Sequence, residues 1–157
     1  MSEKESKKIV DFLRETGFDF EVLEHAPVYT SEEAARVRNN PLEIGVKSII
    51  LKTSESAFLL ACVSGNKKID LAKLAKLLEV KNLSLASPSE VVQHTGCEIG
   101  SVGPFGNVFG LKTFFDKRVL ENKFVEFNIG LHTRSVRMNP KDLARAVKPD
   151  IADFAKA

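Results

Sequence analysis

The chain has few cysteines, and the two that are present do not suggest a disulfide framework or a four-ligand metal site. Cys62 lies in an apolar segment typical of a strand, and Cys97 lies in a glycine-rich segment. Disulfide-stapled domains and structural zinc sites need more cysteines in closer spacing. We therefore expect a protein of a reducing compartment, and a cytoplasmic location.

The chain also lacks a long hydrophobic run. The longest, from Ala57 to Val63, is far shorter than the roughly 20 apolar residues that span a bilayer. The first residues are charged and no apolar stretch follows them, so we expect no export signal. A membrane is therefore not an expected partner.

Neither sign of charge dominates, because 23 basic residues face 21 acidic ones for a net charge of +2. Bulk charge therefore does not require nucleic acid as a partner, and DNA is not expected. Local basic groups could still contact phosphates, although solvated surface charge is the favoured explanation for each group. The groups are Arg36/Arg38, Lys67/Lys68, Lys112/Lys117/Arg118 and Arg134/Arg137/Lys141/Arg145.

Several catalytic motifs are missing. The sequence has no H-E-x-x-H, no paired C-x-x-C, no G-x-S-x-G, no P-loop and no G-x-G-x-x-G after a strand. Its three histidines are not spaced to share one helix or strand face. A metal hydrolase or a nucleotide-dependent enzyme is thus not expected, and neither is a metal or a cofactor.

Apolar periodicity and capping signals predict helices and strands in irregular alternation. Helices are expected over 5–16, 31–38, 71–78 and 88–95, with a last one starting at Asn139, and strands over 18–22, 46–52, 57–63, 83–86, 111–115, 124–128 and 131–138. This order lacks a regular strand-helix-strand repeat, so it predicts an α/β fold with a mixed sheet surrounded by helices. No linker or repeat divides it, and residues 1–157 are expected to form a single domain.

One lysine stands out within the strand predicted over 46–52. Lys47 shares an alternating face with Ile49 and Leu51, which places an ammonium group on an apolar face. A lysine at a strand end that extends to solvent explains the pattern. The alternative is a cation at the mouth of a cleft, placed to hold a phosphate or a ribose hydroxyl.

The segment from Gly96 to Gly106 contains four glycines and a proline, which predicts a shaped loop. Within it, Gly100 to Pro104 could direct backbone N–H groups toward one point, as in loops that bind anions or polarise carbonyls. An ordinary turn explains the same composition. A valine at position 100 would restrict φ there, and we expect it to lower activity with little change in thermal stability.

Four segments in register carry a resemblance that covers nearly the whole chain. They are residues 24–35 (EHAPVYTSEEAA), 45–52 (GVKSIILK), 63–71 (VSGNKKIDL) and 96–106 (GCEIGSVGPFG). Together they resemble the YbaK/ProX family of aminoacyl-tRNA deacylases, the free-standing relatives of the editing domain in bacterial prolyl-tRNA synthetases. The resemblance implies a partly barrel-like mixed β-sheet surrounded by helices.

The resemblance also assigns roles to residues. Lys47 matches the family's substrate-binding lysine, and Gly100 to Pro104 match its G-x-x-x-P loop, so Lys47, Gly100 and Pro104 are the expected catalytic residues. The expected substrate-binding residues are Ser48, Ser101, Val102, Gly103 and His132. His132 falls where several members carry a histidine that helps to select the amino acid. Ser48 departs from the asparagine that often follows the lysine in alanine-specific members.

The implied function is trans-editing: hydrolysis of the ester that joins a small, wrongly attached amino acid to tRNA, with tRNA(Pro) carrying Ala or Cys as the expected substrate. The expected partners are the acceptor end of the mischarged tRNA and, as a candidate, prolyl-tRNA synthetase. Because an aminoacyl ester is already activated, positioned backbone groups can suffice without a triad or metal. In similar members the terminal ribose hydroxyl of the tRNA assists.

Two alternatives belong to other classes of protein. One is a non-catalytic module with the same fold that binds the tRNA end or a synthetase. The other is a small-molecule pocket protein, which would show no salt-dependent binding of tRNA. The retained Lys47 and the loop Gly100 to Pro104 favour the enzyme over the first alternative.

Overall fold

The computed structural model of the chain describes residues 2–157; Met1, the first residue of the predicted domain, lies outside them. The helices are α1 (Ser2–Thr16), α2 (Ser31–Arg38), α3 (Leu71–Leu77), α4 (Pro88–Thr95), α5 (Gly106–Phe109) and α6 (Pro140–Val147), with short 3-10 helices η1 (Leu42–Ile44) and η2 (Lys117–Glu121). The strands are β1 (Phe20–Glu24), β2 (Val46–Thr53), β3 (Phe58–Ser64), β4 (Lys68–Ile69), β5 (Leu83–Leu85), β6 (Lys112–Asp116), β7 (Val125–Leu131), β8 (Arg134–Met138), β9 (Asp150–Ala152) and β10 (Ala155–Lys156).

The strands form one mixed sheet and two antiparallel ones. The larger sheet has the order β5-β2-β3-β6-β9, a second sheet has the order β1-β8-β7, and β10 pairs with β4. In the larger sheet β2 is antiparallel to β3 and β5, whereas β6 is parallel to β3 and β9. The predicted α/β fold with a mixed sheet and surrounding helices is confirmed, and its sheets are open rather than closed into a barrel.

Strand β3 lies at the centre of the larger sheet and is buried on both faces. Leu60 and Cys62 face a core between the two larger sheets, while Leu59, Ala61 and Val63 face a second core under α3. A strand covered on both sides needs a continuous apolar run. The run from Ala57 to Val63 therefore predicted a buried strand. The main core also takes apolar side chains from α1, β7, β8 and α6.

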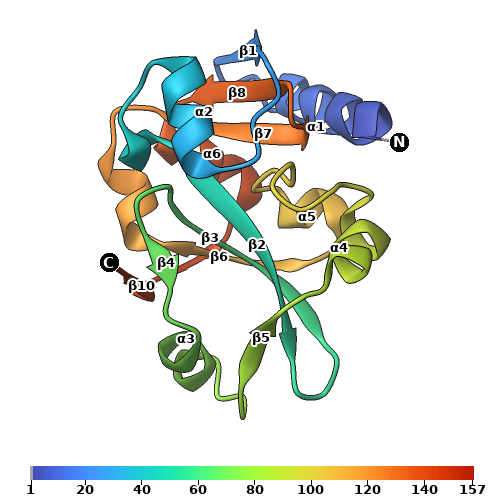
Figure 1. The fold of residues 1–157 in the computed structure, drawn as a ribbon, viewed down its shortest axis with the longest axis vertical. Coiled ribbons are helices and arrows are strands. Elements are labelled where there is room, and N and C mark those ends of the chain that lie inside the picture. Colours follow the sequence, from blue (N-terminus) through green and yellow to red (C-terminus); the bar gives the residue numbers. More distant parts are fainter. Residues whose placement is uncertain (1) are drawn as a thin grey trace.

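Figure 1 shows the two sheets at different levels of the molecule. The sheet of β1, β8 and β7 lies with α1 and α2 at one end, and α3 and β5 lie at the other. Strand β2 runs from the first region toward the second. The N-terminal part of β2 therefore lies where the two sheets meet, beside α2.

Capping residues set the ends of α2 and α4 as predicted. The Thr30 hydroxyl accepts a hydrogen bond from the Glu33 N–H at 3.1 Å, and Asn39 ends α2 in the left-handed conformation with φ of 57°. At α4 the Ser87 and Glu90 pair makes both hydrogen bonds of a capping box. These local signals fix where α2 begins, and α2 forms one wall of the cavity described below.

Local structure differs from the expectations in three places. The strand predicted over 18–22 runs over Phe20–Glu24, where it is an edge strand paired with β8 and Val22 is 42% exposed. The strand predicted over 131–138 is interrupted, since Leu131 ends β7 and the next two residues form the turn into β8. The short strands β4, β9 and β10 were not predicted at all.

Within residues 2–157, no helix combines the length and the apolar composition that crossing a bilayer requires.

Candidate active site

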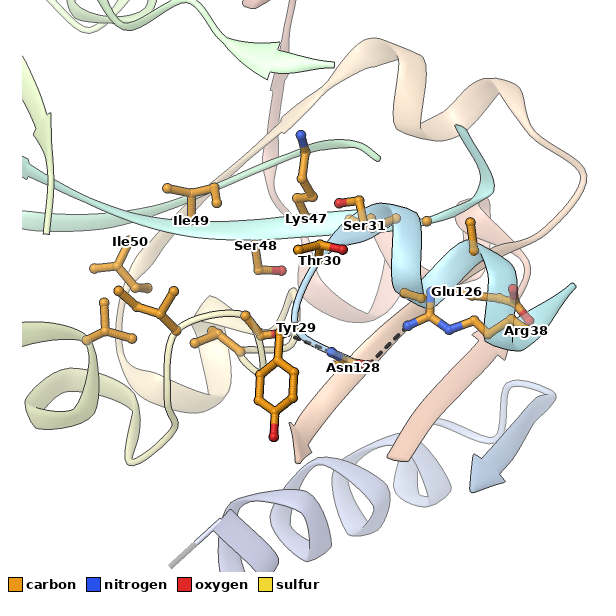
Figure 2. A pocket seen from close by; sticks show the side chains of 18 of the residues that line it. Tyr29, Thr30, Ser31, Arg38, Lys47, Ser48, Ile49, Ile50, Glu126 and Asn128 are labelled. Carbon is orange, nitrogen blue, oxygen red and sulfur yellow. Dashed lines mark hydrogen bonds between the residues drawn. The ribbon is translucent and has the colours of Figure 1, made fainter. Parts of the chain in front are cut away.

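A cavity of about 330 Å³ opens where β2, α2 and β7 approach one another. Its walls come from α2, from the first half of β2, from the loop 99–102 and from two polar residues of β7, Glu126 and Asn128. Figure 2 shows these side chains from close by. The cavity therefore gathers two of the segments that the sequence analysis singled out, the Lys47 strand and the glycine-rich loop.

Lys47 and Ser48 both line the cavity but point to opposite sides of β2 (Figure 2). Ser48 lies on the side of Tyr29 and Asn128, with its hydroxyl 3.6 Å from the Cys62 sulfur. Lys47 extends away from that side, as the alternation of a strand requires. A ligand that fills the cavity can thus meet a hydroxyl inside and an ammonium at the edge.

The Lys47 ammonium is half-buried and makes no salt bridge with any residue in the range 2–157. Burial lowers the pKa of Lys47 from its usual value, the nearby Glu32 carboxylate opposes that shift, and Lys68 adds to it by repulsion. A partly desolvated cation without a counterion is stabilised by an anionic ligand. This arrangement favours the cleft-edge explanation of Lys47 over a lysine that is fully solvated.

The floor of the cavity is a hydrogen-bonded polar network around Asn128. Its amide Nδ2 donates to the Gly100 carbonyl at 2.8 Å, and its Oδ1 accepts from Arg38 Nη2 at 3.1 Å. Arg38 also donates to the Ser135 hydroxyl, at 2.9 Å from Nη2 and 3.2 Å from Nε. The network ties the glycine-rich loop to β7 and α2, so the loop backbone is held in one position.

A buried carboxylate supports this network. Glu126 is 1% exposed and accepts hydrogen bonds from Asn40 Nδ2 and Arg137 Nε, both at 2.8 Å. Burial lowers the pKa of Arg38, and the charge of Glu126 opposes that shift. Glu126 is therefore the main counter-charge for the guanidinium groups at the cavity floor.

A serine and a histidine also lie close together in this region, but not as a catalytic pair. The His25 Nε2 is 2.7 Å from the Ser135 Oγ. Ser135 is fully buried, does not line the cavity and already accepts two hydrogen bonds from Arg38. An attacking hydroxyl must reach the substrate, so this serine serves to hold Arg38.

Two residues of the glycine-rich loop, Gly100 and Val102, line the cavity. Gly100 has φ of +86°, a conformation that favours glycine. Among residues 2–157 the N–H groups of Gly100, Val102 and Gly103 have no backbone acceptor outside regular helices and strands, and no side-chain acceptor. Gly100 and Val102 thus combine a place in the cavity lining with N–H groups that have no acceptor among residues 2–157.

The positive φ at Gly100 overturns one expectation. A valine there would be strained in any surroundings, so a thermal stability close to that of the wild type is no longer expected. The Cβ of any such residue would lie 3.5 Å from the Tyr29 carbonyl oxygen and 3.6 Å from His132 Cε1, which are ordinary contacts. The expected loss of stability in such a variant comes from backbone strain and not from a steric clash.

The other predicted loop residues lie outside the cavity lining. Ser101 is 1% exposed, and its hydroxyl donates to the Glu98 carbonyl at 2.8 Å. Gly103 is required by packing, since a Cβ there would meet the Asn128 carbonyl oxygen and the Phe105 ring, both at 3.1 Å. Pro104 is buried. The catalytic role of Pro104 and the binding roles of Ser101 and Gly103 remain predictions.

His132 occupies the turn between β7 and β8, next to the cavity but outside its lining. Its Nδ1 lies 2.9 Å from the Val28 carbonyl oxygen, which can only accept, so Nδ1 carries the proton. Its ring lies against the Tyr29 ring with 4.4 Å between centroids and an interplanar angle of 37°. The predicted role of His132 in choosing the amino acid is untested by this arrangement.

Within residues 2–157, carboxylates pair with six of the eleven basic residues in the groups noted from the sequence. Ion pairs hold Lys112, Lys117, Arg118, Arg134, Arg137 and Arg145. Surface or structural charge pairing therefore explains two of the four groups. Arg38 differs, because it lines the cavity and binds Asn128 and Ser135.

The described residues offer neither a metal site nor an activated thiol. Within 2–157 no group of three or more His, Cys, Asp or Glu side chains could hold a metal ion. Burial raises the pKa of Cys62 to about 12 and that of Cys97 to about 11, so both thiols stay protonated.

Sequence reasoning missed the floor of the cavity. Glu126 and Asn128 alternate with buried residues of β7, a pattern that normally indicates a solvent-facing side. Arg38 appeared only as one of several surface cations. The available signal was two polar side chains on one strand face next to the glycine-rich loop, but nothing local in the sequence indicates that this face lines a cavity.

Comparison with known proteins agrees with this architecture. The aminoacyl-tRNA editing domain family matches residues 25–146. A Ser/Thr-tRNA deacylase of Escherichia coli K12, ProXp-y, is 29% identical over 154 residues, covering 96% of this chain and 92% of the relative. The prolyl-tRNA editing protein ProX of Acetoanaerobium sticklandii is 26% identical, with 89% and 88% covered.

A solved structure of a related protein has the same fold. The crystal structure of a protein assigned as a trans-editing enzyme for prolyl-tRNA synthetase superposes with a TM-score of 0.86 at 28% identity, covering 98% of each chain. With this family match and with relatives named as tRNA deacylases, the chain is a hydrolase that acts on the aminoacyl-tRNA ester bond. The chain belongs to the aminoacyl-tRNA editing domain family, and the predicted resemblance is confirmed.

Proposed function

We propose that this protein removes a small, wrongly attached amino acid from tRNA in trans, and that the cavity between β2, α2 and β7 is where the ester is hydrolysed. The observation that carries the proposal is that one cavity is lined by Gly100 and Val102, whose N–H groups have no acceptor among residues 2–157, and by Lys47, which forms no salt bridge in the same range. One set of groups suits an ester carbonyl, and the other suits a phosphate. A cytoplasmic, single-domain enzyme is part of the same proposal.

In this mechanism the ester carbonyl oxygen accepts hydrogen bonds from the Gly100 and Val102 N–H groups. A water molecule attacks the carbonyl carbon, the negative charge that develops on the oxygen is held by those N–H groups, and the bond to the ribose oxygen breaks. The products are the free amino acid and a tRNA with its terminal hydroxyl restored. A neighbouring ribose hydroxyl of the tRNA assists the water, so the protein needs no nucleophile of its own.

The cavity's size and lining favour a small amino acid. The side of β2 that carries Ser48 continues into apolar groups from Ile50, Ala86, Val91 and Val102. A volume of about 330 Å³ must hold both the amino acid and part of the terminal ribose. We propose tRNA(Pro) carrying Ala or Cys as the substrate, with the tRNA acceptor end, and prolyl-tRNA synthetase as a candidate partner.

A second candidate substrate class is favoured by one relative and one residue. The Escherichia coli relative is a Ser/Thr-tRNA deacylase. In this chain the Ser48 hydroxyl faces the cavity and has only the Cys62 sulfur, a weak hydrogen-bond partner, beside it. It could bind the hydroxyl of a seryl or threonyl group. The substrates to compare are therefore tRNAs carrying alanine, cysteine, serine and threonine.

The role of the loop backbone is tested by comparing Gly100→Ala with Ser101→Ala in deacylation of a mischarged tRNA. A methyl group at position 100 enters beside the reacting ester and strains a backbone with φ of +86°, and we expect turnover to fall at least about 10-fold. Ser101→Ala removes a hydroxyl that bonds the Glu98 carbonyl away from the cavity. It should keep turnover within about 3-fold of the wild type, because the main chain is unchanged.

Gly17→Ala is the matched control. Gly17 has φ of +77° and nothing within 4 Å of an added Cβ, so it shares the strain of Gly100→Ala without being near the cavity. Both variants should lose about 1–2 kcal/mol of stability, but only Gly100→Ala should lose turnover well below its melting temperature. The opposite ranking, with Ser101→Ala inactive and Gly100→Ala normal, would make Ser101 a catalytic group and would reject the backbone mechanism.

A further inference from the structure

An aromatic ring at the cavity mouth has no role in the mechanism above. Tyr29 lines the cavity, yet it is 63% exposed. Two other strongly exposed apolar side chains, Leu85 at 64% and Ile99 at 52%, line the same cavity. Exposed apolar groups gathered at one opening mark a surface that a ligand covers.

The Tyr29 ring is supported by a contact with His132. One face lies against the His132 ring, and His132 is fixed through its Nδ1 to the Val28 carbonyl. The Val28 N–H in turn donates to the His132 carbonyl at 3.0 Å, and Val28 is fully buried. Two hydrogen bonds to a core residue therefore fix His132, and His132 supports one side of the exposed Tyr29 ring, which suits a platform.

The position of the ring relative to the loop defines what could lie on it. A Cβ at Gly100 would lie 3.6 Å from Cε1 of His132, whose ring contacts the Tyr29 ring, so this pair of rings lies beside the loop proposed to hold the ester. The ester is joined to the terminal ribose, and the base of that nucleotide is carried by the same ribose. Lys47 points to the other side of β2 from Tyr29 (Figure 2), which leaves the phosphate and the base on separate sides.

We propose that Tyr29 is the stacking platform for the terminal nucleobase of the tRNA, backed by His132. The inference rests on the proposed function and names a binding residue for it. Flat aromatic rings bind bases through stacking and apolar contact, and the contact tolerates any base because each has a π-face. Tyr29 thereby positions the ribose and the ester at Gly100 and Val102, while it takes no part in bond breaking.

The chain supplies its own probe, because Tyr29 is its one tyrosine and it has no tryptophan. Tyrosine emission of the wild type therefore reports on this ring alone. The trinucleotide CCA should quench the emission in a saturable way, and the same oligonucleotide with an abasic last position should not. N-acetyltyrosinamide at the same concentrations corrects for light absorbed by the nucleotides.

Kinetics test the same contact during turnover. Tyr29→Leu should raise KM for a mischarged tRNA by about 5- to 150-fold with kcat nearly unchanged, as expected for the loss of one base–aromatic stack. Tyr29→Phe keeps the ring and should stay within about 2-fold. Leu77→Ala removes an equally apolar side chain that is 52% exposed on α3 and outside the cavity lining, and it should change neither constant.

The outcomes separate this inference from the function on which it rests. If the wild type hydrolyses mischarged tRNA but CCA leaves the emission unchanged, the platform is rejected and the function stands. If CCA quenches but no mischarged tRNA is hydrolysed, base binding stands and the function fails. If Tyr29→Leu weakens binding to prolyl-tRNA synthetase without altering KM for free tRNA, the exposed rim serves a protein contact and the platform is rejected.

Discussion

Lys47→Ala is expected to lower deacylation of a mischarged tRNA by on the order of 10²-fold, because an ester displaced by about 1 Å from its backbone donors reacts that much more slowly. The variant removes a half-buried ammonium at the cavity edge that has no ion pair within residues 2–157. No hydrogen bond or salt bridge of the folded protein is lost, so the melting temperature should change little. Single-turnover rates and thermal melts of the same preparation give both values.

Two further variants assign the loss to the charge at this position. Lys47→Met keeps the aliphatic stem and should be as impaired as Lys47→Ala, whereas Lys68→Ala removes the neighbouring cation, which lies outside the cavity lining, and should stay within about 3-fold. Lys47→Ala should also reduce the log–log salt slope of tRNA binding by about 0.7, the value for one phosphate contact on a single strand. Wild-type activity in Lys47→Ala, or tRNA binding that does not depend on salt concentration, would contradict the assignment of Lys47 as a phosphate-binding cation.

Glu126→Ala is expected to cost about 3–5 kcal/mol of folding stability, the usual result of removing one partner from a buried ion pair. Glu126 is 1% exposed, and its loss leaves Arg137 Nε without its acceptor and Asn40 Nδ2 with the Arg38 carbonyl oxygen alone. Arg38, whose charge Glu126 balances, would also lose support. A domain of this size should then melt roughly 10 °C lower.

Glu21→Ala is the control, since Glu21 also pairs with Arg137 but on the surface. Its carboxylate is 3.9 Å from Arg137 Nη1 and its side chain is 67% exposed. Exposed pairs contribute about 0–1 kcal/mol, so this variant should melt near the wild type. Equal effects of the two substitutions, measured by denaturant unfolding, would show that Glu126 is not the anchor of the cavity floor.

Local signals predicted the elements that form the cavity walls. Thr30 and Glu33 mark the start of α2, and the apolar runs that became β2 and β3 mark two strands buried in the sheet, because both signals act over a few residues. The glycine-rich loop was predicted for a similar reason. Lys47 was found because a charge on an apolar strand face is unusual wherever the strand lies.

The parts that failed depend on contacts between distant segments. Whether the polar face of β7 meets solvent or a cavity is decided by Arg38, which approaches Asn128 from 90 positions away in the sequence. Strand β10 pairs with β4 because the Asp116 carboxylate accepts from the N–H groups of Phe154 and Ala155. Neither contact leaves a periodic pattern in its own segment.

The predicted loop shows the same limit at the scale of single residues. Its composition indicated a backbone that approaches a ligand, and Gly100 and Val102 do line the cavity. Composition could not tell Gly100, which has a positive φ, from Gly103, which is needed because the Asn128 carbonyl and the Phe105 ring lie so close. The different roles of the two glycines become visible only when the packing of β7 and the core against the loop is known.

The most direct test of the central claim is the rate at which the purified protein releases amino acids from tRNA(Pro) carrying alanine or cysteine and from seryl- and threonyl-tRNA, measured beside tRNA(Pro) carrying proline. We predict that at least one of the small mischarged esters is hydrolysed well above its rate in buffer, while the prolyl ester is not. Hydrolysis of none of them, or of the prolyl ester at the same rate, would contradict the proposal that this cavity edits mischarged tRNA.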